Sequence, residues 1–209
     1  MHSAPLSTRP WLQTFRGLAW CADAPEDFDY DIGEIAHALS NLCRFAGHCT
    51  RFYSVAEHSV RVAIAARHDQ FVRIKDDRDD RSIQPMDRYW LDELSRAALL
   101  HDAAEAFWTD MPAPLKRLPE LAGYRSLIKR AEFAITHCFG VAMYRTHAAI
   151  KHADLVLLAT EKRDVMGPSP HSGEWLPLPE PLVETIEPWT PEQARKQFLD
   201  AWRAYGGAL

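Results

Sequence analysis

The sequence has little cysteine, no excess of positive charge and no long apolar run. Its 4 cysteines form no CxxC pair and no dense disulfide pattern, which favours free thiols and a reducing, cytoplasmic location. With 24 Lys and Arg against 29 Asp and Glu, the net charge of −5 argues against nucleic-acid partners, because phosphate binding needs a basic face. No stretch reaches the roughly 18 apolar residues of a membrane helix. The N-terminus also lacks the apolar core of a signal peptide, so we expect no membrane contact.

The chain is long enough for one domain with a sizeable core. It has 209 residues, of which 47% are hydrophobic and 25% charged, as in ordinary globular proteins. We find no internal repeat and no run of alternating apolar and polar residues, so the expected fold class is all-α. Composition shifts divide the chain into an extended N-terminal arm anchored by aromatic residues (1–30), a core (31–166), a Pro-rich loop (167–189) and a C-terminal helix packed on the core (190–209).

Capping signals mark three helix starts. Asp31, Ser54 and Thr190 are each followed three residues later by Glu or Gln, a pair of side chains that satisfies the first free amides of a helix. Residues 67–85 crowd charges and lose apolar periodicity, so we expect a solvated loop there. With apolar spacing as the guide, the predicted helices cover 31–42, 54–66, 87 or 92 to 107, 121–139, 146–166 and 190–206.

Two ionisable residues interrupt the apolar side of the third predicted helix. His101 and Asp102 follow Leu100 and precede two alanines, a place where unpaired polar groups are costly. Adjacent helical residues point about 100° apart, so both side chains can reach one ion at the helix edge. Asp154 interrupts an apolar helix face in the same way, and His58 lies near the start of its helix.

Two imidazoles and two carboxylates form a mixed nitrogen and oxygen set. Such a set suits one divalent metal ion, Mn²⁺, Co²⁺, Fe²⁺ or Mg²⁺, with Zn²⁺ as a further candidate, and leaves positions for water and a phosphate oxygen. The alternative from the residues alone is that His101 and Asp102 form a satisfied buried pair and that Asp154 acts as a cap. His48 and Arg51 either line the same pocket or are solvated loop residues.

The order of these residues resembles a known enzyme superfamily. His58, then His101 and Asp102, then Asp154 follow the H…HD…D order of the HD-domain metal-dependent phosphohydrolases. The stretches SVAEHS and HDAAEAFWTDMPAPLKR resemble the bacterial 5′-deoxynucleotidase branch, and the small viral HD enzymes that remove triphosphate from deoxynucleotides are similar too. The resemblance covers roughly residues 31–165 and implies a compact multi-helix HD-domain bundle.

The resemblance also implies a role for each matching residue. The metal ligands would be the four residues already singled out, His58, His101, Asp102 and Asp154. Glu105 would be the catalytic residue that assists the attacking water, and Asp110 would contact the sugar or the leaving group. Arg44 and Lys116 would bind the phosphate. Phe45 stands where the deoxynucleotidases have Trp, at the contact with sugar and base.

These roles imply a phosphohydrolase with a small nucleotide substrate. The most similar branch would remove the 5′-phosphate of deoxynucleoside monophosphates with a metal-activated water. One alternative is a dNTP triphosphohydrolase, which shares the ligand set but directs the water to a different phosphorus atom. A second alternative is a non-catalytic helical binding module, which the full ligand set and Glu105 disfavour. The sequence leaves open whether the chain forms a homo-oligomer.

Overall fold

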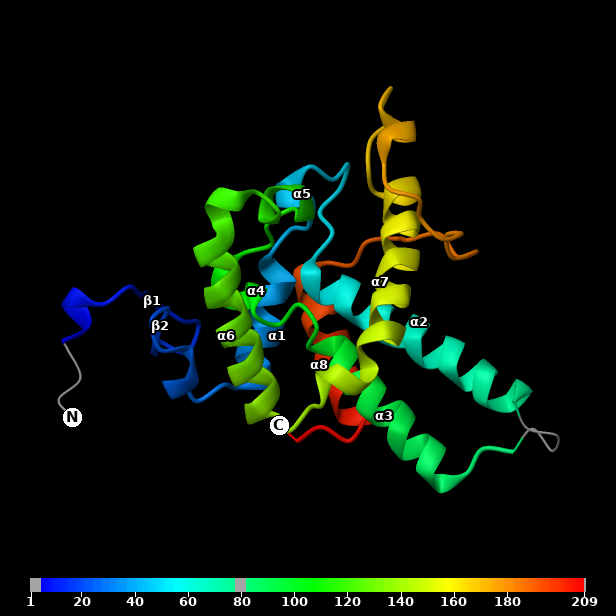
Figure 1. Ribbon diagram of the computed structural model, residues 1–209, viewed down its shortest axis with the longest axis horizontal. Helices are drawn as coiled ribbons and strands as arrows, with labels where there is room; N and C mark the ends of the chain where they lie inside the picture. The colour runs from blue at the N-terminus through cyan, green and yellow to red at the C-terminus, as the bar shows by residue number, and fades with distance from the viewer. Residues whose placement is uncertain (1–4, 78–81, 209) are drawn as a thin grey trace.

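Eight α-helices run through residues 5–77 and 82–208, the part of the chain that the computed structural model describes (Figure 1). They are α1 (Ile32–Asn41), α2 (Val55–Asp76), α3 (Pro85–Leu99), α4 (Glu105–Trp108), α5 (Ala113–Lys116), α6 (Ala122–Cys138), α7 (Met143–Asp164) and α8 (Pro191–Ala204). One antiparallel hairpin precedes them, made of β1 (Trp11–Gln13) and β2 (Ala19–Cys21). The all-α prediction is confirmed apart from this hairpin, whose 3-residue strands are too short to give a periodic pattern.

The three predicted helix starts are confirmed. Asp31 Oδ1 accepts a hydrogen bond from the amide three residues on at 2.9 Å, and Ser54 Oγ accepts one in the same register at 3.1 Å. At the start of α8, the side chains of Thr190 and Gln193 each accept a hydrogen bond from the other residue's amide. Such caps fix the first turn because the first four amides of a helix have no partner within it.

The loop predicted for residues 67–85 is wrong over most of its length. Helix α2 continues well into this range and α3 begins at its last residue, while residues 78–81 lie outside the described residues. Two of the charges that suggested a loop are paired on the helix, since Arg67 Nη1 lies 2.7 Å from Asp92 Oδ1 of α3 and Arg73 Nε lies 3.2 Å from Asp69 Oδ2 within α2. Ion pairs along α2 and with α3 thus accompany helical structure in this charge-rich stretch.

The third predicted helix ends earlier than expected. Helix α3 stops at Leu99 rather than at Phe107, and a turn leads to the short α4. Helix α7 begins at Met143, before the predicted start at residue 146. The early end of α3 matters because the candidate ligands His101 and Asp102 lie on the turn and not on a helix.

Helix α2 is the central element of the bundle. It packs against α1, α3, α7 and α8, and α7 also packs against α3. The first half of α2 is buried, including the polar side chains of Glu57 and His58. The bundle therefore holds His58 inside the core, where only a specific set of partners can compensate for its lost hydration.

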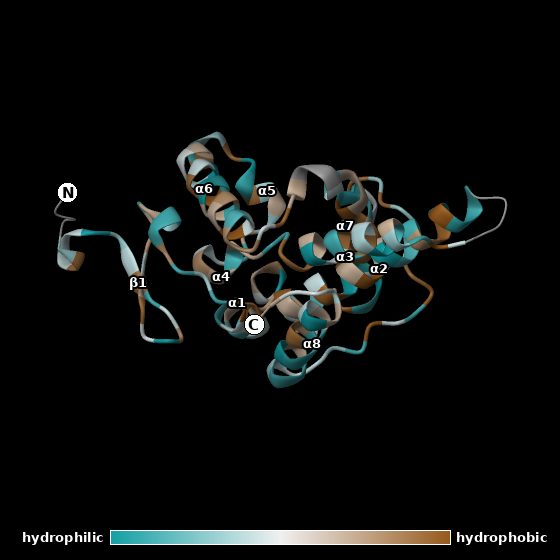
Figure 2. Ribbon diagram, turned by 90° about the horizontal axis from the view of Figure 1, so that it is seen from below, coloured by the Kyte–Doolittle hydropathy of each residue, from teal (hydrophilic) through white to brown (hydrophobic). Residues whose placement is uncertain are grey.

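The N-terminal hairpin lies at one end of the molecule, outside the helical bundle (Figures 1 and 2). Trp20 of β2 stacks on Phe107 of α4 with ring centroids 5.2 Å apart. The indole Nε1 of Trp20 also donates a hydrogen bond to Tyr30 Oη at 3.2 Å. Aromatic side chains thus attach the hairpin to the bundle.

The segment between α7 and α8 has no α-helix or strand and returns along α7. The amide of Leu182 donates to Thr160 Oγ1 at 2.9 Å, and the amide of Ile186 donates to Asp164 Oδ2 at 2.8 Å. These bonds hold the segment against α7 and lead it to the start of α8. Among the described residues, no helix has the length and apolar character needed to cross a membrane.

Candidate metal centre

The structure brings the four predicted metal ligands together in the middle of the bundle. His58 comes from α2, His101 and Asp102 from the turn after α3, and Asp154 from α7. His58 Nε2 lies 3.3 Å from His101 Nε2 and 3.4 Å from Asp154 Oδ1. Asp102 Oδ2 lies 3.2 Å from His101 Nε2 and 3.8 Å from His58 Nε2. Ligand atoms of His58, His101 and Asp154 all lie within 4.8 Å of one another and form a group that could hold a metal ion, and Asp102 lies beside this group against both imidazoles.

The hydrogen bonds of both imidazoles direct their lone pairs toward this group of ligand atoms. His58 Nδ1 lies 2.6 Å from Glu161 Oε1, and His101 Nδ1 lies 2.7 Å from the carbonyl oxygen of Ala98. Because a carboxylate and a carbonyl only accept, each Nδ1 is assigned the proton and each Nε2 the lone pair. In this assignment both Nε2 atoms are acceptors, like the carboxylate oxygens of Asp102 and Asp154, and such a set fits a divalent metal ion. Lys151 Nζ and Arg44 Nη1 also lie against the two carboxylates, at 2.8 Å from Asp154 Oδ2 and 3.6 Å from Asp102 Oδ2.

The turn that carries His101 and Asp102 has a local cause. Helix α3 ends at Leu99, and the carbonyls of a last helical turn have no amide partner within the helix. His101 Nδ1 uses one of these, the carbonyl of Ala98, and this contact orients the ring. The expectation that both ligands sit on one continuous helix edge is wrong, because the helix ends before them.

Neighbouring opposite charges in the cluster counteract the effect of burial on the pKa values of its members. Burial alone would lower the pKa of His101, but without a metal ion the neighbouring Asp102 carboxylate raises it to about 9, so that metal binding through Nε2 would release a proton. Burial likewise opposes ionisation of Asp102, yet the His101 imidazole holds the pKa of Asp102 well below its usual range. The pKa of Asp154 is also lowered against the effect of burial, mainly by its contact with His58. Both carboxylates are therefore ionised and suited to bind a cation.

A buried carboxylate that the sequence analysis did not single out supports the cluster. Glu161 of α7 is 0% exposed, and it contacts His58 Nδ1 through Oε1 and Arg44 Nη2 through Oε2, at 2.6 and 3.1 Å. It lies two helical turns after Asp154, so both carboxylates share one face of α7. This spacing from Asp154 is the feature of the sequence that could have pointed to Glu161. The contact with His58, 103 residues away, could not be inferred from it.

The Arg44 side chain is buried, whereas a residue that binds phosphate at the protein surface would be exposed. Its guanidinium pairs with Glu161, and Arg44 Nη1 lies 3.6 Å from Asp102 Oδ2. The buried Nε of Arg44 has no hydrogen-bond partner among the described residues. Arg44 therefore sits against the ligand set with one donor unused.

Glu105, one of the two predicted acids, is the first residue of the short helix α4, and the other, Asp110, follows the end of this helix. Glu105 is 5% exposed, its Oε1 accepts a hydrogen bond from Lys116 Nζ at 2.7 Å, and its buried Oε2 has no partner in the described chain. Burial raises the pKa of the Glu105 carboxyl well above its usual range, Asp102 and Asp110 add to this, and Lys116 opposes it. Such a group is a strong base once ionised.

Asp110 and Phe45 contact each other. The amide of Phe45 donates to Asp110 Oδ2 at 3.1 Å, and Phe45 adopts a positive φ of 54°. Asp110 thus stabilises a strained turn beside Arg44. The two undecided loop residues point outward: His48 is exposed, and Arg51 forms a surface ion pair with Glu187 at 3.0 Å.

A cleft of about 850 Å³ opens at the ligand set. It begins at His101, Asp102 and Asp154 and continues between α6 and α7. Sites for small molecules in proteins have volumes of about 300–1,000 Å³. The cleft therefore gives a small substrate direct access to His101, Asp102 and Asp154, behind which His58 is buried.

Comparison with known proteins places the chain in a family. No protein-family model matches the sequence. Over 194 residues, 91% of this chain and 92% of the relative, the sequence is 32% identical to the uncharacterized protein YfdR of Escherichia coli K12. The chain belongs to the YfdR family. A second relative is an uncharacterized protein of Rhodobacter capsulatus, to which this YfdR family member is 32% identical over 164 residues. The alignment covers 76% of this chain and 74% of the relative.

For this YfdR family member, replacing Glu161 with Gln is expected to weaken metal binding by about 10- to 100-fold, because Glu161 orients the His58 ring and raises its basicity. The substitution keeps the shape of the side chain and removes its charge. Titration of the metal-free protein with Mn²⁺ measures the effect. Glu187→Gln, which changes an exposed carboxylate in a surface pair, is the matched control. Equal Mn²⁺ affinities in Glu161→Gln and the unmodified protein would exclude a positioning role.

Proposed function

We propose that this protein is a metal-dependent phosphohydrolase that removes the 5′-phosphate of deoxynucleoside monophosphates. One observation carries the proposal: His58, His101 and Asp154 form a group that could hold a metal ion, with Asp102 beside it, and three of these four residues line a cleft. The ligand order resembles that of the HD-domain phosphohydrolases, which supports the reaction class. The bound metal is one divalent ion, Mn²⁺, Co²⁺, Fe²⁺ or Mg²⁺.

When bound, such an ion lowers the pKa of a water molecule and neutralises charge on the phosphoryl oxygens. Glu105 would hold that water through Oε2, which has no partner in the described chain, and would take its proton when the carboxyl is ionised. Lys116 stays paired with the other oxygen of Glu105 and keeps the carboxyl in place. In this reaction, Glu105 is the general base and Lys116 its positioning residue.

The cations beside the ligand set suit a single phosphate. Arg44 lies against Asp102 and has an unused Nε donor, while Lys116 lies beside Glu105. Positive groups at these places stabilise the negative charge that develops on a phosphoryl group in the transition state. Arg44 and Lys116 alone suit one phosphate, as the monophosphatase requires, whereas Lys129 and Lys151 in the cleft are the further cations that a triphosphate would contact.

A substrate screen tests the proposal. The purified protein is incubated with deoxynucleoside monophosphates, ribonucleoside monophosphates and dNTPs, each with Mn²⁺, Co²⁺ or Mg²⁺, and the released phosphate species are measured. We expect orthophosphate from deoxynucleoside monophosphates, and none after removal of metal by a chelator. Triphosphate release from dNTPs would replace the proposal with the triphosphohydrolase. Stoichiometric metal without any hydrolysis would instead favour a binding module.

A further inference from the structure

The cleft extends beyond the ligand set along the second half of α6 and the start of α7. Among the residues that line it are Lys129, Phe133 and His137 of α6 and Lys151 of α7. Lys151 Nζ contacts Asp154 Oδ2 at 2.8 Å, so the cleft wall joins the ligand set directly. A substrate whose phosphate reaches the ligands must place the rest of its atoms against this wall.

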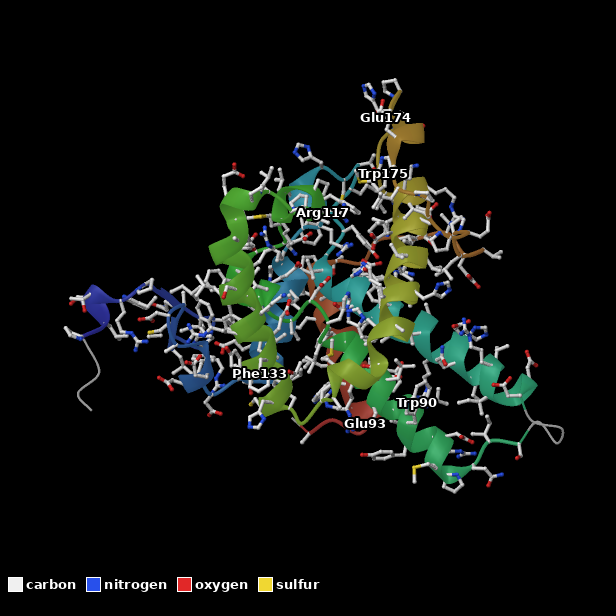
Figure 3. The ribbon with its side chains drawn as sticks, in the orientation of Figure 1. Trp90, Glu93, Arg117, Phe133, Glu174 and Trp175 are labelled. Carbon is white, nitrogen blue, oxygen red and sulfur yellow. The ribbon has the colours of Figure 1, made fainter. Side chains whose placement is uncertain are left out.

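The α6 wall carries two aromatic rings at the surface. Phe133 is 72% exposed at the cleft wall, and Figure 3 labels it on α6. Its ring is stacked on that of His137, one helical turn away, at 10° from parallel and with centroids 6.0 Å apart. The two rings form a stacked pair, the platform, whose exposed aromatic surface suits a planar ligand.

Phe45, which the family resemblance places at the base contact, is less accessible. Its ring packs against the core, and the guanidinium of Arg44 lies 5.2 Å from the ring centroid. One face of Phe45 is thus already engaged and its ring is half-buried, whereas Phe133 remains largely exposed although it stacks on His137. Lys129, one turn before Phe133, adds an exposed positive charge to the same wall.

We propose that the Phe133 and His137 rings stack on the base of the nucleotide substrate. This inference rests on the proposed function and names the site that recognises the nucleoside part. Stacking on an aromatic side chain contributes about 1–3 kcal/mol per base and tolerates every base, because each has a π-face. The platform therefore binds purine and pyrimidine nucleotides alike and gives little base selectivity.

Substitutions at Phe133 distinguish stacking of its ring on the base from a purely structural role of the side chain. Phe133→Ala removes the ring, Phe133→Leu keeps apolar bulk without a ring, and Phe133→Trp keeps a stacking surface. The control is Tyr89→Ala, since Tyr89 is an aromatic residue of α3 that is 62% exposed and does not line the cleft. Two measurements are made: KM and kcat for dAMP, dTMP and the base-free 2-deoxyribose 5-phosphate, and calorimetric binding of deoxyadenosine, which needs no turnover.

We expect Phe133→Ala and Phe133→Leu to raise KM for dAMP and dTMP about tenfold and to weaken deoxyadenosine binding similarly. The kcat values and the KM for 2-deoxyribose 5-phosphate should stay within about twofold, and Phe133→Trp should retain binding. Equal losses on base-containing and base-free substrates, unchanged values, or no deoxyadenosine binding by the unmodified protein would each overturn the platform. If deoxyadenosine binding depends on Phe133 but nothing is hydrolysed, the platform stands and the proposed function fails.

Discussion

Replacing Glu105 with Gln is expected to lower the rate of phosphate release by about 10²–10⁴-fold, the usual contribution of a general base. The amide has almost the same shape as the carboxylate but cannot accept the proton of the attacking water. Glu105 has one oxygen held by Lys116 and one buried oxygen without a partner among the described residues. Metal and substrate binding should remain, because Glu105 is not one of the four convergent ligands.

Single-turnover phosphate release with the metal content checked measures this effect. The control is Glu174→Gln, which changes an exposed carboxylate after α7, labelled in Figure 3. It should keep the rate of the unmodified protein. A Glu105→Gln variant with full metal and a near-normal rate would remove Glu105 from the chemistry.

Local signals account for the parts of the fold that the sequence predicts well. The starts of α1, α2 and α8 follow from caps at Asp31, Ser54 and Thr190, interactions that act within four residues of the chain. The extension of α2 was missed because its support is tertiary. Arg67 pairs with Asp92 of α3, 25 residues away, and composition alone cannot show such a contact.

The candidate site likewise has residues that local sequence signals predict and contacts that only tertiary packing creates. His101, Asp102 and Asp154 stood out because each is an ionisable residue in apolar surroundings, His58 because it lies near the start of a predicted helix, and the motif order then linked all four. Their convergence needs three helices to pack, which no local pattern specifies. Glu161 was missed because a buried acid on a long helix has no distinctive neighbours in sequence.

Replacing Asp102 with Ala is expected to abolish stoichiometric metal binding and reduce hydrolysis to background. The substitution removes one of two carboxylates, and the two remaining imidazoles and Asp154 then carry less negative charge toward a cation. Removing Asp102 also takes away the carboxylate nearest to Arg44 Nη1, at 3.6 Å. Asp200→Ala is the matched control, because Asp200 is an aspartate of α8 that pairs only with surface cations, Lys196 and Arg203.

The metal content of the purified protein tests the central claim most directly. Elemental analysis by mass spectrometry is carried out after loading with Mn²⁺ and removal of free ions, on the unmodified protein, Asp102→Ala and Asp200→Ala. Circular dichroism confirms that each variant is folded. We predict one Mn²⁺ per chain in the unmodified protein and in Asp200→Ala, and no stoichiometric metal in Asp102→Ala. A folded Asp102→Ala that retains one metal per chain, or an unmodified protein that binds none, would contradict the assignment of this site.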